Sequence, residues 1–130
     1  MNRSAFAGVV AGAAMLSMFV RDVPVVAQPV APLVDVSGLW MSRYGNGPEN
    51  RLNLGQAGLF VTGTYTSNVT MPGAMAGRFT ALTLNGRWTD ASSTGGFQIT
   101  FSPNGRAFVG TWGLTPDSFN SGGAWTGRRQ

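Results

Sequence analysis

The 130-residue sequence contains no cysteine, no histidine and no lysine. Without cysteine there is no disulfide, no thiol nucleophile and no cysteine-linked lipid anchor. Without histidine the usual zinc and copper ligands and the commonest catalytic base are missing. A serine nucleophile would also lack its base, because lysine is absent too. These absences predict a protein that is not an enzyme and that holds no metal or other cofactor.

Charge is scarce as well, at 11% of the residues. The nine basic residues are all arginines, and only Arg128 and Arg129 are adjacent. Nucleic-acid binding needs a clustered basic face, so we expect no nucleic-acid partner. The acids beyond the first 27 residues are expected in the leader, in loops and at a strand end, where no two form a catalytic pair: Asp35, Glu49, Asp117 and Asp90.

The first 27 residues have the pattern of an export signal. An early arginine precedes the uncharged run AFAGVVAGAAMLSMFV (5–20), and Val25 and Ala27 suit a cleavage site. The run is shorter than the roughly 20 residues that a spanning helix needs. We therefore expect a secretory signal at 1–27, an extended leader at 28–35 and a domain at 36–130, in the periplasm or secreted by a bacterium. A retained anchor is the alternative; after cleavage no stable membrane insertion is expected.

Abundant glycine and short alternating apolar runs predict an all-β domain. We expect strands near 36–43, 50–56, 59–67, 76–80, 82–90, 95–102, 106–113 and 121–129. Every linker is short enough to join antiparallel neighbours, and SPNG (102–105) has the sequence of a tight hairpin turn. The fold class is therefore an eight-stranded antiparallel up-and-down meander barrel.

The triplet glycine-any-aromatic occurs six times, ending at Trp40, Tyr65, Phe79, Trp88, Trp112 and Trp125. In each half of the domain the second expected strand lacks it, which indicates two four-strand repeats. Residues i and i+2 of a strand share a face, so the glycine leaves space beside the ring or lets the strand bend. We expect these rings to point inward and to fill the core before they serve any ligand.

The triplets also resemble those of known small barrels. GLW at 38–40 with an arginine in the last strand resembles lipocalin-type calycins, and this likeness implies that Arg128 or Arg129 covers Trp40. GLW followed by VTGTYTS (61–67), and by GRF (77–79) or LNGRWTD (84–90), is similar to avidin and streptavidin. That likeness places Tyr65 and Ser67 in a ligand pocket, with Ser42 where the family has an asparagine.

The chain departs from the avidin pattern in two later strands. GFQITFS (96–102) lacks the family's tryptophan, and Arg106 and Ala107 stand where the family presents serine and threonine. Biotin itself is therefore not the expected ligand.

Three functions remain open on the sequence. The first is an exported barrel that binds a small, largely apolar ligand through Ser42, Tyr65, Ser67, Trp88 and Trp112. The second is a protein-interaction module, such as an inhibitor of an exported hydrolase that uses residues 28–36 as an arm. The third is a structural surface protein. Oligomerisation is compatible with all three.

Overall fold

The computed structural model describes residues 31–66 and 72–130. The predicted signal at 1–27, the first part of the leader and the candidate ligand residue Ser67 lie outside the described residues. Residues 31–130 form one compact unit. Within the described ranges there is no helix long and apolar enough to cross a bilayer.

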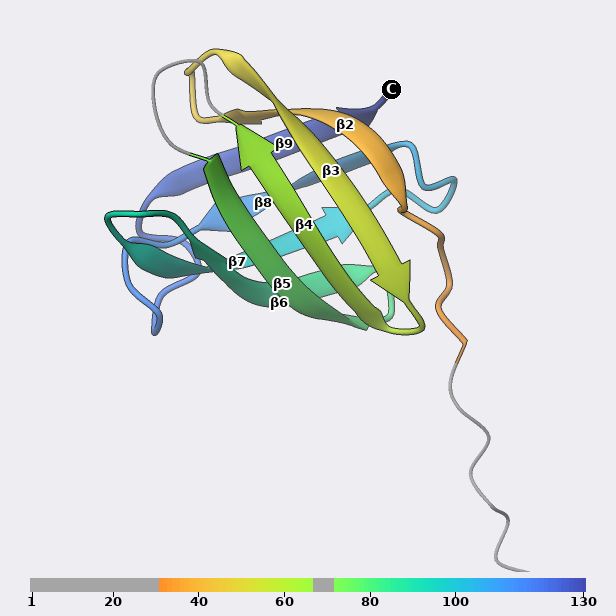
Figure 1. Cartoon of the computed structure of the whole chain (residues 1–130). Helices are drawn as coiled ribbons and strands as arrows, with labels where there is room; N and C mark the ends of the chain where they lie inside the picture. Colours follow the sequence, from red (N-terminus) through yellow and green to blue (C-terminus); the bar gives the residue numbers. More distant parts are fainter. Residues whose placement is uncertain (1–30, 67–71) are drawn as a thin grey trace, which may run out of the picture. The chain divides into compact units, whose positions relative to one another are not determined.

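Eight antiparallel strands follow one another around a closed barrel, in which the last strand pairs with the first (Figure 1). The strands are β2 Gly38–Tyr44, β3 Glu49–Ala57, β4 Phe60–Thr66, β5 Pro72–Thr80, β6 Thr83–Thr89, β7 Thr94–Phe101, β8 Ala107–Trp112 and β9 Gly123–Arg129. Closure leaves no unpaired sheet edge. The predicted all-β, up-and-down meander barrel is confirmed.

The largest difference in strand boundaries is at β5, which begins at Pro72 rather than near residue 76. The proline and glycine that open this strand were expected in the preceding linker. Proline is tolerated as the first residue of a strand, where its missing N–H removes no essential ladder bond. The Asn104–Gly105 turn is as expected: Gly105 has a φ of 72°, and its N–H donates to the carbonyl of Ser102 at 2.8 Å.

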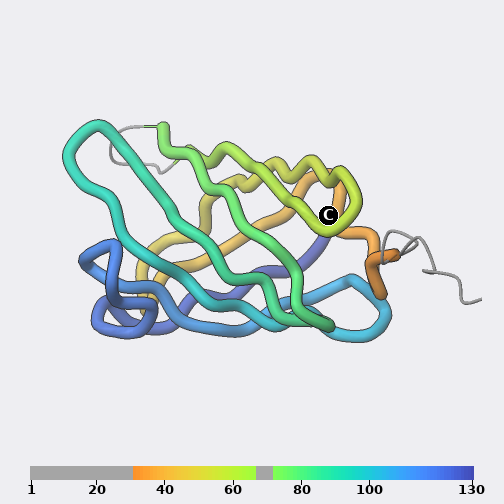
Figure 2. The backbone as a smooth tube through the Cα atoms, turned by 90° about the horizontal axis from the view of Figure 1, so that it is seen from below, coloured from red at the N-terminus to blue at the C-terminus, as the bar shows by residue number. Residues whose placement is uncertain are grey.

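The barrel has two ends. In Figure 2, a view from below relative to Figure 1, they lie at the left and the right of the picture. The loop end carries the connections at 45–48, 90–93 and 113–122. The plugged end carries the short turns at 58–59 and 81–82, the turn at 102–106 and the segment 34–37. Val34, which the sequence assigned to the leader, is 8% exposed and packs in the core at the plugged end. It packs there because a barrel end without a covering segment would expose core rings to water.

Inward and outward positions alternate along every strand, as a period of two requires. The fully buried large side chains are mostly apolar: Trp40, Trp125, Phe97, Phe101, Phe108, Leu52, Leu84 and Ile99. All six triplet aromatics are on the inner face, so the predicted direction of these rings is correct. Rings from the two halves of the domain contact each other in the core: Trp40 of β2 and Phe108 of β8 lie 5.5 Å apart between centroids.

The space beside the rings comes from glycines on neighbouring strands, rather than from those of the triplets. Tyr65 lies opposite Gly73, Trp88 opposite Gly95, and Phe108 opposite Gly127. A Cβ on any of these three glycines would overlap the facing ring. Each ring therefore lies across the backbone of the adjacent strand, and the cross-strand register decides where a glycine is needed.

Candidate functional site

Five aromatic side chains form a cluster at the loop end of the barrel. Tyr44, at the end of β2, stacks on Trp125 with ring centroids 5.1 Å apart and planes 23° apart. It also meets the edges of Tyr65 at 6.0 Å and Trp112 at 5.9 Å, and Trp88 meets Trp112 at 5.9 Å. The structure thus brings together three predicted ligand residues, Tyr65, Trp88 and Trp112, around a tyrosine that was not predicted.

Ser42 lies one step deeper on the same face of β2. It is 1% exposed, and its hydroxyl donates to Oδ1 of Asn50 at 2.7 Å. Asn50 is 5% exposed and directly opposite on β3. Because the serine proton is used on Asn50, the Ser42 hydroxyl can only accept a hydrogen bond from a ligand.

Hydrogen-bonding atoms of the loop-end cluster differ in whether they have partners. The Trp88 indole N–H donates to the carbonyl of Gly113 at 2.9 Å. Within the described ranges, the buried side-chain polar atoms that lack a hydrogen-bond partner are Tyr44 Oη, Trp112 Nε1 and Trp125 Nε1. All three belong to the loop-end cluster, so the unsatisfied polarity of the described core is concentrated at this end.

Both tyrosines of the cluster are held in the protonated form. Burial raises the pKa of Tyr65 to about 12, and the carboxylate of Asp90 adds to the rise. Burial, and then the charge and the nearby hydroxyl of Tyr65, raise the pKa of Tyr44 still further, while the same contact between the hydroxyls opposes the rise in the pKa of Tyr65. At neutral pH both hydroxyls can therefore donate a hydrogen bond.

This environment predicts loss of stability in alkali. Unfolded tyrosine ionises near the ordinary value of 10.0, whereas the folded phenols keep their protons to about pH 12 or above. The stabilisation is fully present below pH 10 and is lost as pH rises through the folded pKa values, because the unfolded chain then binds fewer protons.

The chain has two tyrosines, so tyrosinate absorbance against pH reports on these two groups. We expect one transition near or above pH 12 that coincides with loss of the β circular-dichroism signal. A reversible titration near pH 10 in the intact barrel would contradict the burial of both phenols.

The plugged end is closed by Trp40 and Arg129. The Arg129 guanidinium lies 5.8 Å from the centre of the Trp40 ring. It donates to the carbonyls of Asp35 at 2.7 Å and Gly105 at 3.2 Å, and to that of Ser37. The Trp40 indole N–H donates to the carbonyl of Val36 at 2.9 Å.

Arg128, the other closure candidate, points away from Trp40 because consecutive strand residues face opposite sides of the sheet. Its guanidinium is bonded to both carboxylate oxygens of Glu49 on the outer wall. Glu49, which was expected in a loop, is the first residue of β3, and its carboxylate also lies 3.7 Å from Arg43. Arg128, followed by Arg43, lowers the pKa of Glu49.

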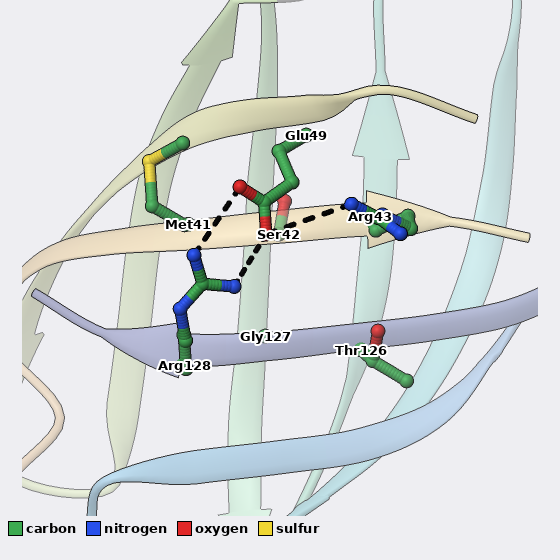
Figure 3. A pocket seen from close by; sticks show the side chains of 7 residues that line it. All are labelled: Met41, Ser42, Arg43, Glu49, Thr126, Gly127 and Arg128. Atoms are coloured by element: carbon green, nitrogen blue, oxygen red, sulfur yellow. Dashed lines mark hydrogen bonds and ion pairs between the residues drawn. The ribbon is translucent and has the colours of Figure 1, made fainter. Parts of the chain in front are cut away.

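A hollow of about 320 Å³ on the outer wall borders this ion-pair cluster (Figure 3). It follows β2 and β9 and is lined by Met41, Ser42, Arg43, Glu49, Thr126, Gly127 and Arg128. The arginines are about half exposed, with side-chain exposures of 48% for Arg43 and 60% for Arg128. Ion pairs this exposed are screened by water and contribute little to stability.

The remaining acids serve local structure. Asp90 follows β6 and accepts the N–H groups of Ser92 at 2.8 Å and Ser93 at 2.9 Å, which lowers its pKa. Asp35 likewise accepts the N–H of Ser37 at 3.0 Å. Over residues 31–66 and 72–130 no three acidic side chains gather as a metal site would require.

Two members of the loop-end cluster, Tyr44 and Trp125, were missed as site residues, and so was Asn50, the hydrogen-bond partner of Ser42. Tyr44 has a sequence signal, because it lies two positions after Ser42 on the same strand face. Asn50 has none, since its importance depends on facing Ser42 across two strands. Trp125 was assigned to the core, where its ring is fully buried, and only the unpaired indole N–H adds it to the site.

The chain was also compared with known proteins. No protein-family model, no curated protein and no solved structure matches this chain.

Proposed function

We propose that the protein is a non-catalytic, exported β-barrel that binds a small, largely apolar ligand at its loop end. One observation carries the proposal: the unpartnered buried polar atoms of the described core all lie within the loop-end aromatic cluster. A barrel that only needs a packed core has no use for polar atoms without partners, since each costs about 1–3 kcal/mol. Ring faces for an apolar body and a few convergent polar atoms are the usual lining of a ligand site.

Native mass spectrometry tests the proposal on protein secreted by an exporting bacterial host. We expect a mass excess from a bound small molecule that disappears when the protein is denatured. Trp112→Ala should remove this excess, because it takes away a ring and an indole N–H from the site. Val109→Ala is the matched control, because this β8 side chain is 62% exposed on the outer wall.

Thermal unfolding of both variants shows whether they are folded. A native protein without a mass excess, or an excess that persists in folded Trp112→Ala, would contradict the proposal. The intact mass also tests export, since cleavage after Ala27 leaves a chain that begins at Gln28.

An interaction module is the second candidate, and the loop at 113–122 favours it. Several backbone hydrogen bonds fix this loop, including two from the N–H of Gly96 to the carbonyls of Thr115 and Ser118 at 3.1 Å. It nevertheless exposes Leu114 (57%) and Phe119 (44%). The predicted N-terminal arm is a weaker candidate, because Val34 and Val36 are packed in the core. An empty native barrel would favour this loop-based interaction.

A further inference from the structure

The unpartnered atoms of the loop end share one chemical property, which is that each can donate a hydrogen bond. An indole N–H is a donor only, and the Tyr44 hydroxyl is protonated at neutral pH. Trp125 is fully buried, and its Nε1 has no partner within the described ranges. The two indole N–H groups have no acceptor within the described ranges, and the Tyr44 hydroxyl has only the neighbouring Tyr65 phenol near it, without a hydrogen bond of normal geometry. These three donors define a site that is incomplete without acceptor atoms.

The other two tryptophans show that this fold can satisfy an indole N–H. Trp40 donates to the carbonyl of Val36, and Trp88 donates to that of Gly113, each at 2.9 Å. Backbone carbonyls are thus recruited at both ends of the barrel. The unpaired state of Trp112 and Trp125 is therefore not a general property of tryptophans in this fold.

The inward side chains of the described strands at the loop end carry no charge, so an ion buried there would lose its hydration without gaining an ionic partner. The inward positions of the described strands at the loop end carry no arginine, and Asp90 lies close enough to raise the pKa of both tyrosines. The Asp90 carboxylate adds a repulsion for anions that solvent weakens, because this side chain is only partly buried. A cation would leave the three donors unpaired and would face the positive ends of their dipoles.

We propose that the loop end takes an uncharged molecule whose buried end carries carbonyl or ether oxygens. Tyr44 Oη, Trp112 Nε1 and Trp125 Nε1 donate hydrogen bonds to these oxygens, and rings of the loop-end cluster contact the apolar remainder. This inference rests on the proposed function, because it specifies the ligand class of the same site.

Two-dimensional ¹H–¹⁵N NMR of the indole N–H groups tests the inference directly. The chain has four tryptophans, so the spectrum has four indole signals, which single Trp→Phe variants assign. The probes are cyclohexanone, cyclohexanecarboxylate and cyclohexylammonium, which share a ring and differ in their polar group. We expect cyclohexanone to shift the signals of Trp112 and Trp125 downfield. The signal of Trp40 is the internal control, because this ring lies at the plugged end and its N–H already has a protein acceptor.

Tyr44→Phe removes one donor and keeps the ring. The affinity for cyclohexanone, taken from the same titration, should fall by about three- to tenfold, the usual effect of one hydrogen bond. Val109→Ala, on the outer wall, should leave it unchanged. An unchanged affinity in folded Tyr44→Phe would overturn the assignment of its hydroxyl.

The outcomes separate this inference from the proposed function. Shifts of Trp112 and Trp125 with a charged probe alone would overturn the ligand class and leave the binding site in place. If no probe shifts them, or if the free protein already shows both indoles bonded to water, the inference is wrong. The mass excess of the native protein decides the proposed function independently of either result.

Discussion

Gly86→Ala should lower the free energy of unfolding by about 3 kcal/mol, because overpacking against backbone leaves little room to relax. Gly86 is the glycine of the NGRW triplet, and it faces inward on β6. A Cβ at this position would overlap the carbonyl oxygen of Ala76 and would lie 2.6 Å from the Cα of Gly77. Both atoms belong to the main chain of β5, so the strand pair itself would have to separate. Urea unfolding followed by tryptophan fluorescence measures the loss.

Gly55→Ala is the matched control for this change. Gly55 also lies inside a strand, but it faces outward, and a Cβ there would have no atom within 4 Å. Alanine should leave stability unchanged or raise it by about 0.5 kcal/mol, since it restricts the unfolded chain. Equal effects at both positions would show that the close approach of β5 does not determine what alanine does at Gly86.

The inner face of the barrel was predictable because strands alternate with a period of two. Trp40 and Ser42 could be placed inside from their spacing alone, as could the tyrosine and tryptophans that end the other triplets. Short linkers between expected strands allowed few connections other than a meander. Up-and-down topology followed from these two features, and closure adds the pairing of β2 with β9.

The cross-strand contacts could not be predicted, because one sequence does not state the register between strands. A shift of one residue would have placed Pro72 or Ala74 opposite Tyr65 in place of Gly73. The bond between Ser42 and Asn50 depends on the same register. The sequence therefore indicated which rings face inward and gave no information on which polar atoms would find partners.

The choice between the two terminal arginines shows the same limit. The family resemblance allowed either residue, and the decision required knowing which of them continues the inward set of β9. Arg129 does so, and it meets three carbonyls of the plugged end. Arg128 has the opposite direction and a different partner, Glu49.

Arg129→Ala should destabilise the barrel by about 2–4 kcal/mol, even though it leaves the core side chains intact. The guanidinium connects segment 34–37 and the turn at 102–106 through three carbonyl oxygens, and it covers the Trp40 ring. A buried hydrogen bond from a charged group contributes about 1.5–3 kcal/mol. The three bonds of Arg129 are exposed or half-buried, so water screens them and their sum with the cation–π contact stays within the expected loss. Loss of all of them should also weaken the packing of Val34 and Val36. Thermal unfolding and hydrogen exchange of the Ser37 and Gly105 amides measure the two effects.

Two variants of this region separate charge from geometry. Arg128→Ala removes the same charge from the neighbouring residue and should change thermal unfolding little, because its pair with Glu49 is exposed. Arg129→Lys should lie between wild type and alanine, since a single ammonium group cannot present a planar fork to three carbonyls. If Arg128→Ala and Arg129→Ala destabilise the barrel equally, the loss of positive charge causes the effect. The contacts of Arg129 at the plugged end would then have no special role. A larger loss of stability in Arg129→Ala than in Arg128→Ala would show that the inward-facing arginine of β9 stabilises the plugged end.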